Sequence, residues 1–274
     1  VRAFSVQPTH NIFDELTDDW SSVRGARLLQ DHYPAGLLGP ATLLIEADES
    51  LDNQAGTDLM QDLAGRIAEV TVDGRAMVAD VLWIDRPLGS RVPPEPPPPL
   101  TKPWAWPVYL AKKKAARDTY LSRDGRCGRI EIFLAEGCYT DRSIDAAVEI
   151  RRVAAEVTAD RPWVRAVMLA GASSTIADIR DVSHRDFAVI SAAVLTAVYL
   201  ILLVVLRRPV LGLVLIGGTV LSFTAALGIA DWVFVGLLGA PGLDWKITFF
   251  LLVLLVAVGD RKSTRLNSSH SELS

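Results

Sequence analysis

Residues 187–206 read FAVISAAVLTAVYLILLVVL, a run of twenty residues without a charge. A helix needs about 20 apolar residues to cross the hydrocarbon core of a bilayer. A second apolar run over residues 210–235 follows after only three residues, Arg207–Pro209, and it is broken only by Asp231 near its far end. We therefore predict two membrane spans, joined by a tight turn into a hairpin.

A third apolar run covers residues 245–259 and stops at Asp260, where the charged, Ser-rich tail 260–274 begins. At about 1.5 Å per residue this run would reach roughly 22 Å, which is short of the roughly 30 Å hydrocarbon core. We interpret it as a truncated third span of a membrane domain over residues 184–259, and the tail as non-native sequence. Since Val1 stands where a start methionine is expected, we infer that the N-terminal end is cut too.

The rest of the chain has the composition of a water-soluble domain. Residues 1–183 hold 21 Lys+Arg against 27 Asp+Glu, a net charge of −6. This charge argues against a nucleic-acid partner, because phosphate binding needs a clustered basic face. Positively charged turns tend to face the cytoplasm, so the Arg207–Arg208 turn places residues 1–183 on the outer side of the membrane.

The soluble domain reads as alternating strands and helices, with apolar residues recurring at helical spacing between strand-like runs. We predict four strands and two helices: strands 40–47, 78–85, 126–136 and 164–171, and helices 52–70 and 141–158, the last capped by Thr140 or Asp141. Two βαβ units of this kind predict an open α+β sandwich with the helices on one face of the sheet. We expect a ferredoxin-like topology.

A proline-rich stretch interrupts this pattern. Residues 86–107 hold nine of the fifteen prolines, and proline-rich chain is extended and without internal hydrogen bonds. We predict an exposed excursion from the sheet. The alternative is a docking segment that presents Trp104 and Trp106.

No stretch carries a convincing catalytic or metal-binding pattern. The sequence VGDRKST (258–264) lacks the glycines of a phosphate-binding loop. GASS (171–174) lacks the second glycine of a nucleophile turn, so we interpret Ser183, His184 and Asp186 as a polar junction and not as a hydrolase triad. His10 and His32 have no partners at ligand spacing. We expect no enzyme activity, no cofactor and no metal.

Two features of the membrane domain remain open to two interpretations. Gly218, Ser222 and Ala226 recur every four residues, which favours close helix packing but is also compatible with a substrate-lining face. Asp260 is the acidic residue that lies deepest along a span, and such groups often mark proton paths. The alternative is that Asp260 is a junction residue at the start of the tail.

Four stretches together resemble the MMPL family of exporters, within the resistance–nodulation–division superfamily. They are SVRGARLLQDHYPAGLLGPATLLIEA (22–47), TYLSRDGRCGRIEIFLAEG (119–137), VMLAGASSTIADIRDVSHRDFAVI (167–190) and GLDWKITFFLLVLLVAVG (242–259). The resemblance covers nearly all of residues 10–259. It implies one external porter domain and the spans after it, from a proton-driven bacterial inner-membrane exporter of lipids or other hydrophobic compounds.

The resemblance also implies the partners: a lipid or hydrophobic small molecule as substrate, the lipid bilayer, and a missing tandem half of the same protein, with an oligomer left open. Its proton relay lies in a Gly-x-Asp-Tyr pattern, whereas here Asp260 directly follows Gly259 and no tyrosine follows. Leu37 stands where the family has an acidic residue after PAG. Two other functions remain alternatives: a membrane-anchored binding or sensor module, and a protein-translocation accessory of the same superfamily.

Overall fold

The structure is a computed structural model, and it describes residues 8–9, 20–33, 35–89, 92–93, 95–239, 243–244 and 250–251. The chain divides into two compact units. We call Asn11–Ile179 the sheet unit, and Arg180–Ser274 together with Val1–His10 the helical unit.

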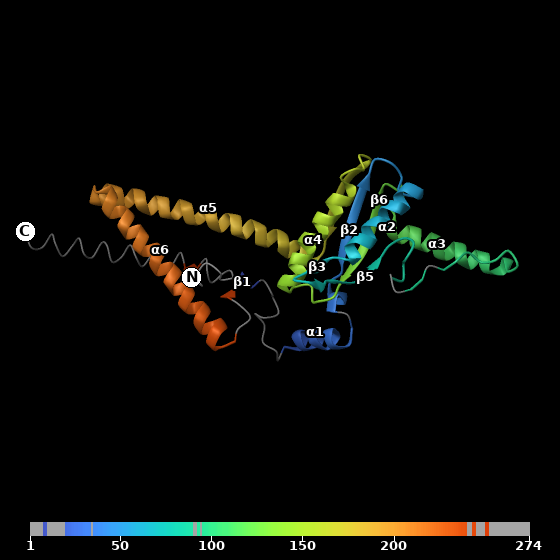
Figure 1. Cartoon of the computed structure of the whole chain (residues 1–274), viewed down its shortest axis with the longest axis horizontal. Coiled ribbons are helices and arrows are strands. Elements are labelled where there is room, and N and C mark those ends of the chain that lie inside the picture. The colour runs from blue at the N-terminus through green and yellow to red at the C-terminus, as the bar shows by residue number, and fades with distance from the viewer. Residues whose placement is uncertain are drawn as a thin grey trace, which may run out of the picture. The chain divides into compact units, whose positions relative to one another are not determined.

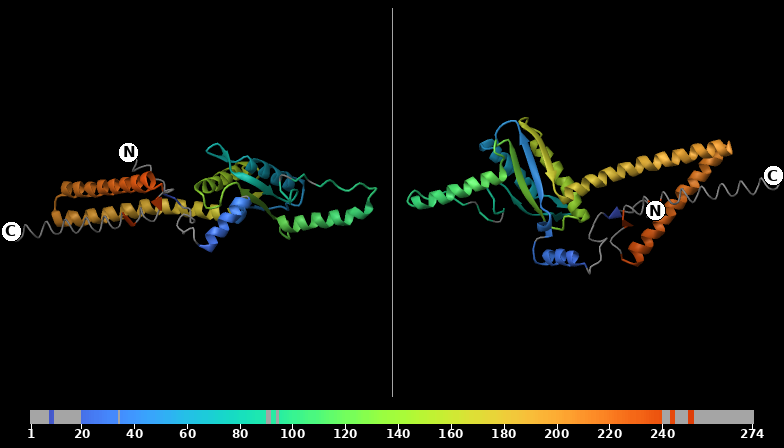
Figure 2. Two further views of the ribbon diagram at one scale, coloured as in Figure 1. Left: turned by 90° about the horizontal axis from the view of Figure 1, so that it is seen from below. Right: turned by 180° about the vertical axis from the view of Figure 1, so that it is seen from behind.

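The sheet unit is built on one four-stranded antiparallel sheet. Its strands are β2 (Ala41–Ala47), β5 (Val78–Leu82), β6 (Cys127–Leu134) and β7 (Val164–Ala170), in the order β5-β6-β2-β7. Helix α2 (Gln54–Ala68) follows β2, and helix α4 (Asp141–Thr158) follows β6. Both helices cover the same face of the sheet (Figure 1), and the right-hand view of Figure 2 shows the strands of the other face. The predicted α+β domain is confirmed.

The core forms because every second strand residue points to the helices. Leu43 and Ile45 of β2 and Ile130 and Ile132 of β6 are at most 1% exposed, whereas Leu44 between them is 38% exposed. The helices meet these strands with residues spaced three or four apart, which share one helix face. The fully buried ones are Leu59, Met60, Leu63 and Ile67 of α2 and Ala146 and Ile150 of α4.

Two polar side chains fix where these helices begin. The side chain of Asn53 accepts a hydrogen bond from the backbone N–H of Gly56 at 2.7 Å. The hydroxyl of Thr140 accepts one from the N–H of Ser143 at 3.2 Å. Each satisfies an amide that has no partner inside its helix. Of the two N-cap residues predicted for the second helix, Thr140 and Asp141, Thr140 is the one observed.

The predicted strand 78–85 is too long. Strand β5 ends at Leu82, and the chain then turns back so that the N–H of Arg86 donates to the carbonyl of Trp83 at 2.9 Å. A small hairpin before β5 was not predicted: β3 (Thr71–Val72) and β4 (Arg75–Ala76) are joined by Asp73 and Gly74, with φ of +51° and +74°. Asp-Gly is the residue pair that two-residue hairpin turns favour.

Helices also form where the sequence analysis expected none. Residues 92–93 and 95–102 have neither helix nor strand, but a 3₁₀ turn, η4 (Pro103–Ala105), leads into helix α3 (Trp106–Tyr120), which projects from the sheet (Figures 1 and 2). Trp104 is 71% exposed, whereas Trp106 packs edge-on against Tyr109. Helix α1 (Ser21–His32) and the 3₁₀ turn η3 (Ala35–Leu38) precede β2.

The helical unit consists mainly of two long apolar helices. Helix α5 (Ala172–Leu206) begins in the sheet unit and starts well before the predicted span at residue 187, since hydropathy marks where a helix becomes apolar and not where it begins. Helix α6 (Pro209–Asp231) continues into a π-helical turn, η5 (Trp232–Leu237). Strand β1 (Pro8–Thr9) pairs in parallel with β8 (Leu243–Asp244). Of the predicted third span only residues 250–251, which are helical, are described.

Candidate functional site

The two apolar helices have the length and composition that a membrane crossing needs. Ala172–Leu206 and Pro209–Leu237 both qualify on these two criteria. Arg207 adopts a left-handed conformation, φ +51°, between them, and Pro209 supplies the fixed φ that suits a first helical turn. The predicted hairpin turn at Arg207–Arg208 therefore lies where the sequence placed it.

The helices touch near this turn and diverge away from it (Figure 1). A Cβ atom added at Gly212 would lie 3.3 Å from Cε2 of Tyr199, so glycine permits this close approach. Other apolar side chains of these helices are exposed: Val204 of α5 is 75% exposed and Leu221 of α6 is 71% exposed. Such a surface requires lipid or further apolar helices to cover it.

The threonine hydroxyl groups of these helices are satisfied locally, whereas the buried hydroxyl of Ser191 has no hydrogen-bond partner among the described residues. Those of Thr196, Thr219 and Thr224 donate to carbonyl oxygens one turn back, at 2.7, 3.1 and 3.1 Å. This removes the cost of leaving a polar group unpaired in hydrocarbon. Gly218 and Ser222 of the predicted small-residue stripe are exposed, and among the described residues no atom lies within 4 Å of a Cβ added at Gly218. Whether the stripe packs a helix or lines a path is untested.

The polar junction predicted around GASS is where α5 begins. Gly171 has φ +135°, and a Cβ there would lie 3.0 Å from Cα of Ala41. The hydroxyl of Ser173 donates to the carbonyl of Cys138 at 2.7 Å, and that of Ser174 to the carbonyl of Leu169 at 2.6 Å. Both serines are 1% exposed. Buried hydroxyls that donate to carbonyl oxygens hold structure together and are not placed to act as nucleophiles.

Arg151 of α4 closes this junction. Its Nη1 donates to Oδ1 of Asp178 at 2.5 Å, and its Nη2 donates to Oδ2 of Asp178 at 2.9 Å. The same Nη2 donates to the carbonyl and to the hydroxyl of Ser174, at 3.2 and 2.5 Å. The hydrogen bonds from Arg151 lower the pKa of Asp178, against a smaller opposing effect of burial. We call Arg151, Ser173, Ser174 and Asp178 the α5 clasp.

A small apolar cluster supports the clasp. Ile144 of α4 packs with Ile176 and Ala177 of α5, with the partly buried Tyr139 against them. All three residues are at most 8% exposed. The first two turns of α5 are therefore packed on the sheet unit.

Sequence reasoning found only part of this site. It singled out GASS, but it did not identify Arg151 or Asp178, which lie 27 positions apart on two different helices. Ser183, His184 and Asp186 all lie within the continuous helix α5, which does not provide the strained strand-to-helix turn of a hydrolase nucleophile. His32 lies in the last turn of α1. His10 and Asp260 lie outside the described residues.

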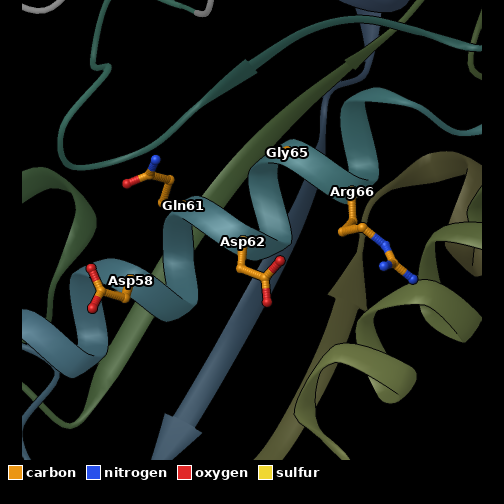
Figure 3. A pocket seen from close by; sticks show the side chains of 5 residues that line it. All are labelled: Asp58, Gln61, Asp62, Gly65 and Arg66. Atoms are coloured by element: carbon orange, nitrogen blue, oxygen red, sulfur yellow. The ribbon is translucent and has the colours of Figure 1, made fainter.

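The surface also has a shallow hollow on α2. Its volume is about 460 Å³, and it is lined by Asp58, Gln61, Asp62, Gly65 and Arg66 (Figure 3). All five come from one helix, and Asp62 is already bound to Arg161 by an ion pair of 2.9 Å. An open hollow on a single charged helix face does not enclose a hydrophobic ligand, which calls for a concave, mostly apolar site.

A comparison with known families covers both units of this architecture. A model of the MMPL family matches residues 16–260. The chain belongs to the MMPL family. This is a family of membrane transport proteins within the resistance–nodulation–division superfamily.

Three relatives show how far the similarity extends. The chain is 34% identical over 148 residues to the probable transport protein MmpL12 of Mycobacterium tuberculosis, which is 54% of this chain and 13% of that protein. It is 32% identical over 134 residues to the apo-petrobactin exporter of Bacillus anthracis, 47% of this chain and 18% of that protein. It is 43% identical over 93 residues to the sulfolipid-1 exporter MmpL8 of M. tuberculosis, which is 34% of this chain and 8% of that protein. The chain spans less than a fifth of each relative's length.

Proposed function

We propose that this chain is part of a proton-driven exporter that moves lipids or other hydrophobic compounds out of the inner membrane of a bacterium. The observation that carries the proposal is the MMPL match over residues 16–260, which includes the sheet unit and the apolar hairpin together. A complete exporter of this kind would contain a second, tandem half. The bilayer and a hydrophobic substrate are its other partners, and an oligomer is left open.

The sheet unit is proposed to be the external porter domain, with a ferredoxin-like topology. Support comes from the strand order β5-β6-β2-β7 with α2 and α4 on one face, because the split βαβ fold has this pattern. The Arg207–Arg208 turn supports an outward location for residues 1–183, since arginines favour the cytoplasmic side.

A hydrophobic substrate is proposed from the names of the relatives and from the exposed apolar surfaces of α5 and α6. Two relatives are named as exporters, one of sulfolipid-1 and one of apo-petrobactin. The exposed apolar surfaces of α5 and α6 support contact of these helices with lipid or with other apolar helices. An exporter that collects its substrate from the membrane needs this environment.

Asp260 is proposed as the proton-relay residue, which requires that this residue belongs to the native chain and that the non-native tail begins after it; the family match extends to residue 260. Support comes from its place at the end of the apolar run 245–259 and from the general rule that an ionisable group within a membrane domain marks a proton path. Protonation of such a group can bias two arrangements of the surrounding helices. A junction residue with no role in transport is the competing assignment.

The test is gradient-dependent efflux of a lipophilic dye from membrane vesicles that contain the full-length protein. We expect efflux that stops when an uncoupler collapses the proton gradient, and that falls at least tenfold in Asp260→Asn. Asp231→Asn is the matched control, because it removes an acidic group that also lies within an apolar run. No efflux from the wild type would contradict the exporter proposal and favour a membrane-anchored sensor or a translocation accessory. Efflux that is unchanged in Asp260→Asn would remove Asp260 from the relay.

A further inference from the structure

We propose that Arg151 is a positioning residue, which fixes the first turns of α5 to α4 so that movement of this helix is passed to the sheet unit during transport. The inference rests on the proposed export function. It concerns a residue that the MMPL resemblance did not single out and that lies far from Asp260 in the sequence.

The guanidinium of Arg151 joins α4 to the start of α5 and, through Ser174, to β7. Arg151 belongs to α4, and it binds both carboxylate oxygens of Asp178 and the hydroxyl and carbonyl of Ser174, all in the first two turns of α5. The Ser174 hydroxyl then donates to the carbonyl of Leu169 near the end of β7. A planar guanidinium paired with a carboxylate in this two-pronged way fixes the angle between the groups as well as their distance.

Apolar packing alone does not define the angle between α4 and α5. The apolar contact beneath the clasp consists of Ile144, Ile176 and Ala177. Hydrophobic contact is non-directional, so a cluster of this size keeps the helix in place without setting its tilt. Directional contacts come from the clasp: Ser173 and Ser174 donate to the carbonyls of Cys138 and Leu169, and Arg151 adds the hydrogen bonds that tie α5 to α4.

The clasp lies at the base of a long helix. Helix α5 continues without a break from Asp178 to Leu206, which is about 42 Å at about 1.5 Å per residue. A tilt of about 10° at the base of a helix of this length displaces its far end by about 7 Å. A small change in the tilt of α5 at the clasp therefore displaces its far end, at Leu206, by several ångströms. A displacement of the far end likewise tilts the base of α5 at the clasp.

The neighbouring residue provides a natural control. Arg152 lies on the same helix, but its guanidinium binds Glu149 and Glu156, both of α4 itself. Its side chain is 55% exposed, whereas that of Arg151 is 32% exposed. Removing Arg152 deletes a charge and two ion pairs from α4 without releasing α5.

The experiment compares Arg151→Gln, Asp178→Asn and Arg152→Gln in the full-length exporter. Two quantities are measured: dye efflux per folded transporter, and the melting temperature of the purified protein. We expect efflux to fall at least fivefold in both clasp variants and less than twofold in Arg152→Gln. Arg151→Lys keeps the charge but loses the two-pronged geometry, and we expect it to restore less than half of the activity. A merely structural role would instead make efflux follow melting temperature across all four variants.

A distance measurement separates this proposal from the proposed function. Spin labels on Gln61→Cys in α2 and Val182→Cys in α5 report the position of α5 relative to the sheet unit, once exposed Cys127 has been replaced by serine. We expect Arg151→Gln to broaden the distance distribution and Arg152→Gln to leave it unchanged. An unchanged distribution in Arg151→Gln would overturn the clasp, whether or not the wild type exports the dye. A broadened distribution with no export by the wild type would overturn the exporter proposal alone.

Discussion

The sheet unit and the helical unit use the same kinds of apolar residue in opposite ways. In the sheet unit, Leu63 and Ile130 are fully buried, whereas in the helical unit Val204 and Leu221 are more than two thirds exposed. The first unit satisfies its apolar side chains by packing them against one another. The second unit leaves its apolar side chains exposed, which suits a lipid environment. In lipid, helices associate through close packing and not through the hydrophobic effect. Stability in water therefore resides in the sheet unit.

The largest effect expected from this difference is on core truncation. Leu63→Ala should lower the free energy of unfolding of the sheet unit by about 2–5 kcal/mol, because it leaves a cavity in a closely packed core. Leu221→Ala on α6 should change it by less than about 0.5 kcal/mol. Denaturant titration of the detergent-solubilised protein, followed by tryptophan fluorescence, measures both. Equal losses would show that α6 is packed as tightly as the core.

A smaller effect is expected at the residue that precedes α5. Gly171→Ala should cost about 1–3 kcal/mol, because the position requires a positive φ and has no room for a Cβ. Gly65→Ala on α2 is the matched control, since nothing lies within 4 Å of its added Cβ among the described residues. That change should stabilise the protein by about 0.5–1 kcal/mol, because alanine favours a helix interior. The same denaturant titration measures both changes. A free energy of unfolding that is unchanged in Gly171→Ala would contradict the close packing at the start of α5.

The smallest effect is the pH dependence of the clasp. Arg151 lowers the pKa of Asp178 in the folded state, so the pair contributes stability above the ordinary aspartate pKa of about 3.9. That contribution is lost as the pH falls through the lowered folded pKa. Because the Asp178 side chain is 62% exposed, we expect less than about 1 kcal/mol.

The measurement is the difference in melting temperature between the wild type and Asp178→Asn. It should be present at pH 7 and shrink as the pH falls below the ordinary aspartate pKa and through the lowered folded pKa of Asp178. A difference that grows as the pH falls would mean that the pair destabilises the folded protein.

The sequence predicted the features that depend on local patterns. Alternation in 40–47 and helical spacing at Leu59, Leu63 and Ile67 were sufficient for β2 and α2, and an uninterrupted apolar run was sufficient for the hairpin. Local signals for two missed elements were present: Asp73-Gly74 for the β3–β4 turn, and Pro107 followed by an Ala- and Lys-rich run for α3.

Other features could not be predicted in this way. The pairing of Arg151 with Asp178 depends on how α4 and α5 pack, and no pattern along the chain encodes a contact between surface-type charges on separate helices. The end of β5 at Leu82 depends on a tight turn at Trp83–Arg86, which apolar alternation through residue 85 conceals. The role of Asp260 depends on residues outside those that the structure describes.

We propose that the sheet unit lies in water outside the cytoplasm and that the turn of the apolar hairpin lies on the cytoplasmic side. Exposed Cys127 of the sheet unit is a native reporter, and Arg208→Cys in a Cys127→Ser background reports the turn. A membrane-impermeant maleimide should label Cys127 in intact spheroplasts, and it should label position 208 only after the membrane has been permeabilised. Labelling of position 208 in intact spheroplasts, with protection of Cys127, would contradict this arrangement.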